Sequence, residues 1–130
     1  MGYEEIIIIM KKKTIFIIDQ NYIDKYKLDS SFLNKKIVIY DDRYDHIEKH
    51  KYEFSSIFEY DNALSSIELI IAEPDFIVID DKKKGIEFIK TLNDNILIAV
   101  RLSSSAELKI KSLYPINEVK RKRLLLKKTN

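Results

Sequence analysis

Residues 96–114 decide the fold, and their sequence is ILIAVRLSSSAELKIKSLY. Two runs rich in apolar and β-branched residues flank three consecutive serines, which is a pattern typical of a β-hairpin with a short loop. The pattern predicts strands at Ile96–Leu102 and Glu107–Tyr114, joined through Ser103–Ser105. Because the connection is short, we expect the two strands to be antiparallel neighbours in one sheet.

The length of the loop also predicts the register of this hairpin. With three loop residues, Val100 faces Leu108 and Ile98 faces Ile110, so that apolar pairs gather on one face of the sheet. The other face then carries the cationic side chains of Arg101, Lys109 and Lys111. We therefore expect one apolar sheet face and one basic face that can be open to solvent.

Two more strands precede the hairpin, and helices precede those strands. Apolar runs at Phe76–Asp80 and Ile86–Thr91 predict the two strands and give four consecutive strands in all. Residues 56–72 have the spacing of an amphipathic helix, which Pro74 ends. We therefore expect an antiparallel meander that packs against helices on one face.

The first 50 residues have weaker patterns. Residues 16–27 favour a helix, Ile37–Tyr40 favours a short strand, and an acidic segment then opens a helix that carries His46 and His50. The whole pattern predicts a single α+β domain, in which N-terminal helices are followed by a four-stranded antiparallel β-sheet.

The charge of the chain is concentrated at its C-terminal end. Residues 101–130 hold nine of the 23 Lys and Arg residues but only two of the 21 Asp and Glu residues. Pro115 starts a last basic helix or tail, with a cationic run formed by Lys120, Arg121, Lys122 and Arg123. A basic end on an otherwise acidic domain favours contact with a polyanion such as a phosphate backbone, and a solvated Lys-rich tail is the alternative.

The composition excludes several classes of protein. The chain has no cysteine, so disulfide scaffolds, zinc–thiolate sites and thiol nucleophiles are excluded. Its two glycines cannot supply a phosphate-binding loop or a nucleotide-binding fingerprint. The apolar run Ile6–Met10 is too short for a signal peptide or for a membrane span, which needs about 20 residues. We therefore expect a cytoplasmic protein with no membrane partner.

His46 and His50 are the only histidines, and a spacing of four residues places them on one face of a helix. Cleavage of RNA without a metal needs a base for the 2′-hydroxyl, an acid for the leaving 5′-oxygen and cations for the phosphorane, and histidine can take the first two roles. Two surface histidines and a zinc-binding pair are the alternatives. The sequence around them departs from the HExxH motif, and Lys49 adds a positive charge, so we expect no metal site.

Three side chains of the last two strands are further candidates. Arg101 interrupts an apolar strand, where it could hold an anion or pair with Glu107 across the hairpin. The hydroxyls of Ser112 and Tyr114 could donate to phosphate oxygens. The alternative is that Ser112 fills a small core position and the ring of Tyr114 caps the core.

From Asp45 to about Leu126 the chain resembles the phage-associated nucleases of the barnase–EndoU–colicin–RelE-like (BECR) group. The resemblance rests on an ordered series of short segments: Asp45-His46-Ile47 with His50, then Ile70-Ile71-Ala72-Glu73-Pro74-Asp75-Phe76-Ile77, then Ile96–Arg101, and finally Ile110–Tyr114. The Pro-Asp-aromatic-Ile segment is the most specific of them. On this basis residues 41–130 are the nuclease core, and residues 1–40 are an N-terminal extension or the first elements of the same domain.

The resemblance implies metal-independent cleavage of RNA, often transfer RNA, by toxins or phage-borne effectors that need no cofactor. A cognate antitoxin or immunity protein would then be a partner. The implied catalytic residues are His46, His50, Arg101, Ser112 and Tyr114. The expected RNA contacts are Lys109, Lys111, Lys120, Arg121, Lys122 and Arg123. The alternative is a non-catalytic module on the same fold that binds RNA or protein, which the basic end also favours.

Overall fold

The computed structural model describes residues 11–103 and 106–128. In chain order, the elements are β1 (Lys12–Ile17), α1 (Gln20–Tyr26), β2 (Lys36–Tyr40), α2 (Asp42–Glu48), α3 (Ile57–Ser65), α4 (Ile67–Ala72), β3 (Phe76–Asp80), β4 (Gly85–Thr91), β5 (Asn95–Leu102), β6 (Leu108–Ile116) and α5 (Glu118–Leu125). Short 3-10 helices occupy Ser30–Phe32 and Lys51–Glu53. The apolar run Ile6–Met10 and two of the three predicted loop serines lie outside the described residues.

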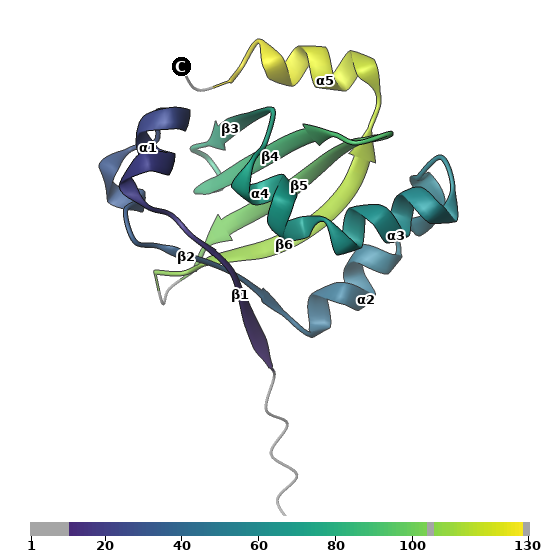
Figure 1. Ribbon diagram of the computed structural model, residues 1–130, viewed down its shortest axis with the longest axis horizontal. Coiled ribbons are helices and arrows are strands. Elements are labelled where there is room, and N and C mark those ends of the chain that lie inside the picture. Colours follow the sequence, from purple (N-terminus) through teal and green to yellow (C-terminus); the bar gives the residue numbers. More distant parts are fainter. Residues whose placement is uncertain (1–10, 104–105, 129–130) are drawn as a thin grey trace, which may run out of the picture.

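The described strands form one mixed sheet of six, in the order β1-β2-β6-β5-β4-β3 (Figure 1). Strands β3 to β6 are an antiparallel meander, as their short connections require. Strand β2 then pairs parallel with β6, and β1 pairs antiparallel with β2. This parallel pairing brings α2, which follows β2 directly, against β6.

The predicted order of N-terminal helices followed by a four-stranded antiparallel sheet is therefore wrong. The meander of four strands occurs as β3 to β6, but β1 and β2 extend the sheet to six strands with one parallel pair. The helix predicted over 16–27 begins only at Gln20, where Asp19 caps it by accepting a 2.8 Å hydrogen bond from the amide of Tyr22. The β-prone residues before Asp19 pair with β2 instead.

The helix predicted over residues 56–72 begins and ends where the pattern placed it, but it is broken in two at Ser66. The Ser65 hydroxyl donates to the backbone carbonyls of Asp61 and Asn62, at 3.0 and 3.1 Å. Serine side chains that bond to nearby backbone in this way compete with helical hydrogen bonding. Because of this break, α4 is a separate helix, which packs against β1, β4 and β5.

The predicted register of the last hairpin is also wrong. Val100 lies opposite Ile110 because the strands pair from Leu102 and Leu108, which leaves a connection longer than the predicted three residues, and a further shift between Ala99 and Val100 places Ile98 opposite Leu113. The extra residue on β6 is Lys111, and a bulge of this kind redirects side chains locally. As a result, cationic and hydroxyl side chains of β6 lie together at one end of the sheet face.

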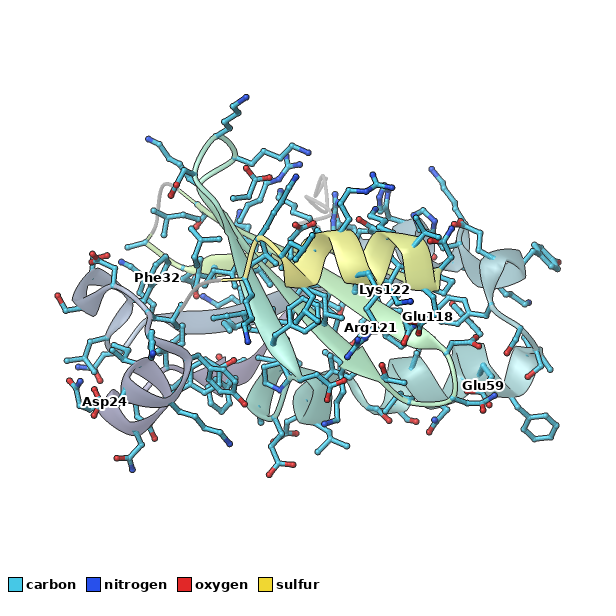
Figure 2. The ribbon with its side chains drawn as sticks, turned by 90° about the horizontal axis from the view of Figure 1, so that it is seen from above. Asp24, Phe32, Glu59, Glu118, Arg121 and Lys122 are labelled. Carbon is cyan, nitrogen blue, oxygen red and sulfur yellow. The ribbon has the colours of Figure 1, made fainter. Side chains whose placement is uncertain are left out.

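The two faces of the sheet are covered to different extents. One face packs under α1 and α4 in a core that includes Ile71, Phe88 and Ile98, all fully buried. On the other face, α5 lies across the strands and its buried Leu124 joins an apolar cluster with Leu97 and neighbouring side chains (Figure 2). We call the part of this face under α5 the covered half and the remainder the open half. No helix in the described part of the chain is long and apolar enough to cross a membrane.

Candidate active site

A cavity of about 410 Å³ lies over the open half of the sheet. Ala99 of β5 lies between Glu87 of β4 and Ser112 of β6, because Glu87 pairs with Ala99 and Ala99 pairs with Ser112. All three residues line the cavity. A methyl group at the middle position takes little space, so a polar ligand can reach the two flanking side chains.

Helix α2 supplies one wall of this cavity. Ile47 is fully buried in the main core and anchors the helix, while Arg43 and His46 line the cavity. The Arg43 guanidinium also donates a 3.5 Å hydrogen bond to the backbone carbonyl of Lys111, at the bulge of β6. The parallel pairing of β2 with β6 thus positions two chemically active side chains beside the sheet.

Positive charge is crowded at this end of the sheet. Lys111 is partly buried, and its burial is the main reason that the pKa of its ammonium group is lowered. The neighbouring positive charges of Arg43, Lys109 and Arg101 lower it further. Arg101 is exposed and lies opposite Lys109 across the hairpin. Repulsion among like charges is relieved when an anion binds between them, so the cavity favours a group such as a phosphate.

His46 has the electrostatic surroundings of a proton acceptor. The pKa of its imidazole is lowered, first by partial desolvation and then by the positive charges of Arg43 and Lys49. The ring is consequently neutral at pH 7. A neutral imidazole beside a group of cations can accept a proton from a hydroxyl of a bound ligand.

His50 occupies a different position from the one predicted. Helix α2 ends at Glu48, and His50 lies just beyond it, where its Nδ1 is in contact with the carboxylate of Glu53. The His50 ring is 6.2 Å from the His46 ring and 5.3 Å from the Tyr114 ring, measured between centroids. The two histidines are therefore close together, but His50 packs against Tyr114, whereas His46 lines the cavity.

Tyr114 and Ser112 both line the cavity, and each side chain carries a hydroxyl. Burial raises the pKa of the Tyr114 phenol, as do the negative charges of Glu87 and Glu53, so this hydroxyl remains a donor. The Lys120 ammonium lies 5.1 Å from the centre of the same ring. The Ser112 hydroxyl is buried and has no hydrogen-bond partner within the described residues, which leaves it able to bind a ligand.

Arg43 and Glu87 are the main cavity residues that were not predicted from the sequence. Burial raises the pKa of Glu87, and the nearby Asp80 acts in the same direction, whereas Lys120 lowers it. A signal was present, because Glu87 is an acidic residue between the apolar Ile86 and Phe88 of one strand. Arg43 had no comparable signal, since its place depends on the pairing of β2 with β6.

The predicted RNA contacts are distributed over several surfaces. Lys109 lies 4.8 Å from the ring centre of Tyr40, beside a small neighbouring cavity that Arg43 and Lys111 also line. Lys122 and Arg123 are exposed on α5. Glu107, which was considered as a partner of Arg101, instead forms a 2.9 Å ion pair with Lys12.

Arg121 is directed away from the cavity. Its guanidinium lies 3.7 Å from the Asp75 carboxylate and 5.4 Å from the ring centre of Phe76, on the side of α5 that faces the sheet (Figure 2). Residues 11–103 and 106–128 contain no group of three His, Asp or Glu side chains arranged to hold a metal ion.

The sequence model of the family described as phage-Barnase-EndoU-ColicinE5/D-RelE like nuclease 3 (PBECR3) matches residues 12–123. This range includes all six described strands and every cavity residue named above. The chain belongs to the PBECR3 family. The resemblance to BECR nucleases inferred from the sequence is thereby confirmed, and membership supports a nuclease-like function. Neither the curated proteins nor the solved structures contain a significant match to this PBECR3 chain.

Proposed function

We propose that this PBECR3 nuclease is a metal-independent endoribonuclease that leaves 2′,3′-cyclic phosphate ends. It would act as a toxin or as an effector of a phage or mobile element, with transfer RNA as the favoured substrate. The observation that carries the proposal is the cavity over the open half of the sheet. There, Arg43, Arg101 and Lys111 line the cavity together with the imidazole of His46, whose pKa is lowered, and the hydroxyl of Ser112, which has no hydrogen-bond partner among the described residues.

In the proposed reaction, His46 accepts the proton of a 2′-hydroxyl. The 2′-oxygen then attacks the adjacent phosphorus, and the bond from phosphorus to the 5′-oxygen breaks. The leaving 5′-oxygen takes a proton from Tyr114, whose raised pKa keeps its hydroxyl protonated. Glu87, a carboxylate that lines the same cavity, is the alternative base.

The cations of the cavity stabilise the charge that develops on the phosphorane. The Arg43 guanidinium donates a hydrogen bond to the backbone carbonyl of Lys111 at the bulge, so Arg43 is held in place before the substrate arrives. Donors fixed in advance stabilise a transition state more than donors that must reorganise. Ser112 can donate its hydroxyl hydrogen to a non-bridging phosphate oxygen, and His50 orients Tyr114 by packing on its ring.

A second candidate function is RNA binding without cleavage. Lys122 and Arg123 are exposed on α5, where they favour contact with the phosphate backbone of RNA without any cleavage. This reading requires the same fold and the same basic surface. It differs in predicting that RNA is retained intact.

The two candidates are separated by incubating the purified protein with total transfer RNA in the presence of EDTA. We expect the wild type to cleave and to leave cyclic phosphate ends, and we expect His46→Ala to reduce the cleavage rate by about 100-fold or more. Glu87→Gln tests the alternative base, and Lys36→Gln, an exposed residue of β2, is the matched control. Undiminished cleavage by His46→Ala would rule out the histidine mechanism, and RNA binding without any cleavage by the wild type would favour the second candidate.

Expression in a bacterial host tests the proposed role as a toxin. We expect growth arrest with the wild type and normal growth with His46→Ala at the same protein level. A cognate antitoxin or immunity protein would relieve the arrest when it is expressed together with the wild type. Equal growth with both proteins would contradict the toxin role.

A further inference from the structure

A second basic cavity, of about 340 Å³, lies beyond the C-terminal end of α5, where Lys128 lines it. Its cations come from segments far apart in the sequence. Lys25 and Lys27 lie at the end of α1, Lys90 belongs to β4, and Lys128 follows α5. The fold thus brings together four ammonium groups that no sequence motif connects.

Two acidic residues also line this cavity, but one of them is already neutralised. The Asp75 carboxylate accepts a 2.8 Å hydrogen bond from the amide of Thr91, and it lies 3.9 Å from Lys90 and 3.7 Å from Arg121. Glu73 is the second, and its backbone carbonyl accepts a 2.6 Å hydrogen bond from Lys90. Lys90 and Arg121 are therefore engaged in contacts within the protein.

The other three lysines are available to a ligand. Within the described part of the chain, Lys25, Lys27 and Lys128 form no ion pair. The rings of Tyr26 and Phe76 line the same cavity and give it apolar walls. The Lys25 ammonium lies 5.4 Å from the ring centre of Tyr26, and ammonium groups beside aromatic rings are suited to a phosphate with its attached sugar or base.

Cations on α5 and just after it lie near both cavities. Figure 1 shows it running across the sheet from the end of β6 towards α1. Lys120 lies at the Tyr114 side of the first cavity, Lys122 and Arg123 are exposed along the helix, and Lys128 lines the second cavity. At 1.5 Å per residue, the helix rises about 7.5 Å from Lys120 to its last residue, Leu125, and Lys128 follows three residues later, so the two lysines are a few nucleotides apart. One strand of RNA can therefore contact both cavities along α5.

We propose that the second cavity is a phosphate-binding site that holds the RNA backbone a few nucleotides away from the bond to be cleaved. The site would make this protein select longer RNA over a dinucleotide. The proposal rests on the proposed function in taking RNA as the ligand, but it concerns binding and needs no chemistry at the second cavity.

The test uses a triple variant, Lys25→Gln, Lys27→Asn and Lys128→Gln, in the full chain. Lys27 has a left-handed backbone, with φ of 54°, which asparagine tolerates. The matched control removes three exposed lysines that line neither cavity, through Lys11→Gln, Lys13→Gln and Lys36→Gln. Unfolding in urea establishes that both variants are folded before they are compared.

Binding of transfer RNA is measured over a series of salt concentrations in the His46→Ala background, so that the RNA is retained. We expect the triple variant to bind about 10-fold more weakly than the control, and the slope of log affinity against log salt to fall by about 2, because each lost phosphate contact removes roughly 0.7–0.9 from it. Cleavage of a dinucleotide by the variant with His46 intact should match that of the wild type.

The proposal is overturned if the triple variant and the control bind transfer RNA with the same affinity and the same salt slope, or if the His46→Ala protein has no affinity for RNA. It is also overturned if dinucleotide cleavage falls as much as transfer RNA cleavage, since the lysines would then act on the reaction itself. If the wild type binds RNA but cleaves nothing, and the triple variant still loses affinity, the phosphate site stands and the endoribonuclease proposal fails.

Discussion

The two halves of one sheet face differ in what covers them, although the same strands build both. In the covered half, Phe76, Ile89 and Leu97 are buried under α5 together with Leu124. In the open half, the side chains at corresponding positions further along the strands are charged, hydroxylated or small. Alternate residues of a strand point to the same face. The change from apolar to polar side chains on this face is therefore set by the sequence of each strand.

The difference shows how a small domain can keep both a stable core and a polar cavity. The burial of apolar side chains under α5 stabilises the face without any contribution from the cavity. The cavity can therefore accumulate cations, and the pKa of Lys111 is lowered first by burial and then by the neighbouring positive charges. Substitutions in the open half should affect activity, and those in the covered half should affect stability.

The largest expected effect is on cleavage, from Lys111→Ala in the open half. Loss of a preorganised cation at a developing phosphorane should reduce the rate of RNA cleavage by about 100- to 1000-fold. The free energy of unfolding should not fall, because the residue is crowded by like charges. Lys122→Ala, an exposed cation of α5, is the control. A rate within 10-fold of the wild type, measured at saturating RNA, would place the reaction elsewhere.

The next effect is on stability, from Leu124→Ala in the covered half. Leu124 is 8% exposed and packs on the sheet, so its truncation should lower the free energy of unfolding in urea by about 2–4 kcal/mol. Leu126→Ala, at a residue that is 90% exposed, is the control and should change little. Cleavage per folded molecule should persist in both variants, and its loss in folded Leu124→Ala would show that α5 is part of the reaction site.

A smaller effect is expected at the start of α5. The Asn117 side chain accepts a 2.8 Å hydrogen bond from the amide of Lys120 and caps the helix. Asn117→Ala should lower the free energy of unfolding by about 1 kcal/mol, whereas Asn117→Asp should retain the cap. Equal stability of all three proteins in urea would mean that the cap contributes nothing to the covered half.

The smallest effect concerns the pH dependence of cleavage. Desolvation first, and then Arg43, lower the pKa of His46, so the base should be active below its ordinary pKa of 6.5. As pH falls, the rate should decline only when His46 becomes protonated, on the acidic side of 6.5. Arg43→Gln removes one cause of the lowered pKa, so the decline should move to higher pH. A decline that stays in place in Arg43→Gln would show that another group, such as Glu87, is the base.

Local patterns were enough to predict part of this fold. The apolar runs of β3 to β6 and the spacing of residues 56–72 are signals carried by neighbouring residues, and these elements occur where they were predicted. The register of the last hairpin has no such signal, because its connection is longer than predicted, with Leu102 opposite Leu108, and the bulge at Lys111 then shifts the register once more. The helix predicted over 16–27 begins later, at Gln20, because residues up to Ile17 form β1, whose partner β2 no local pattern identifies.

The candidate site was predictable to a similar extent. His46, Arg101, Ser112 and Tyr114 were selected from the sequence, and all four line one cavity. Arg43 reaches that cavity only through the parallel pairing of β2 with β6, which joins residues about 70 positions apart in the chain. Such long-range pairing cannot be read from residue types alone, and for the same reason the lysines of the second cavity could not be grouped in advance.

The most direct test of the open half is to fill its cavity. Ala99→Leu places a larger apolar side chain between Glu87 and Ser112, where the scissile phosphate would bind. We predict that this variant unfolds in urea with the same cooperativity as the wild type but no longer cleaves transfer RNA in the presence of EDTA. Cleavage at the wild-type rate by the folded Ala99→Leu variant would contradict the claim that the open half is the reaction site.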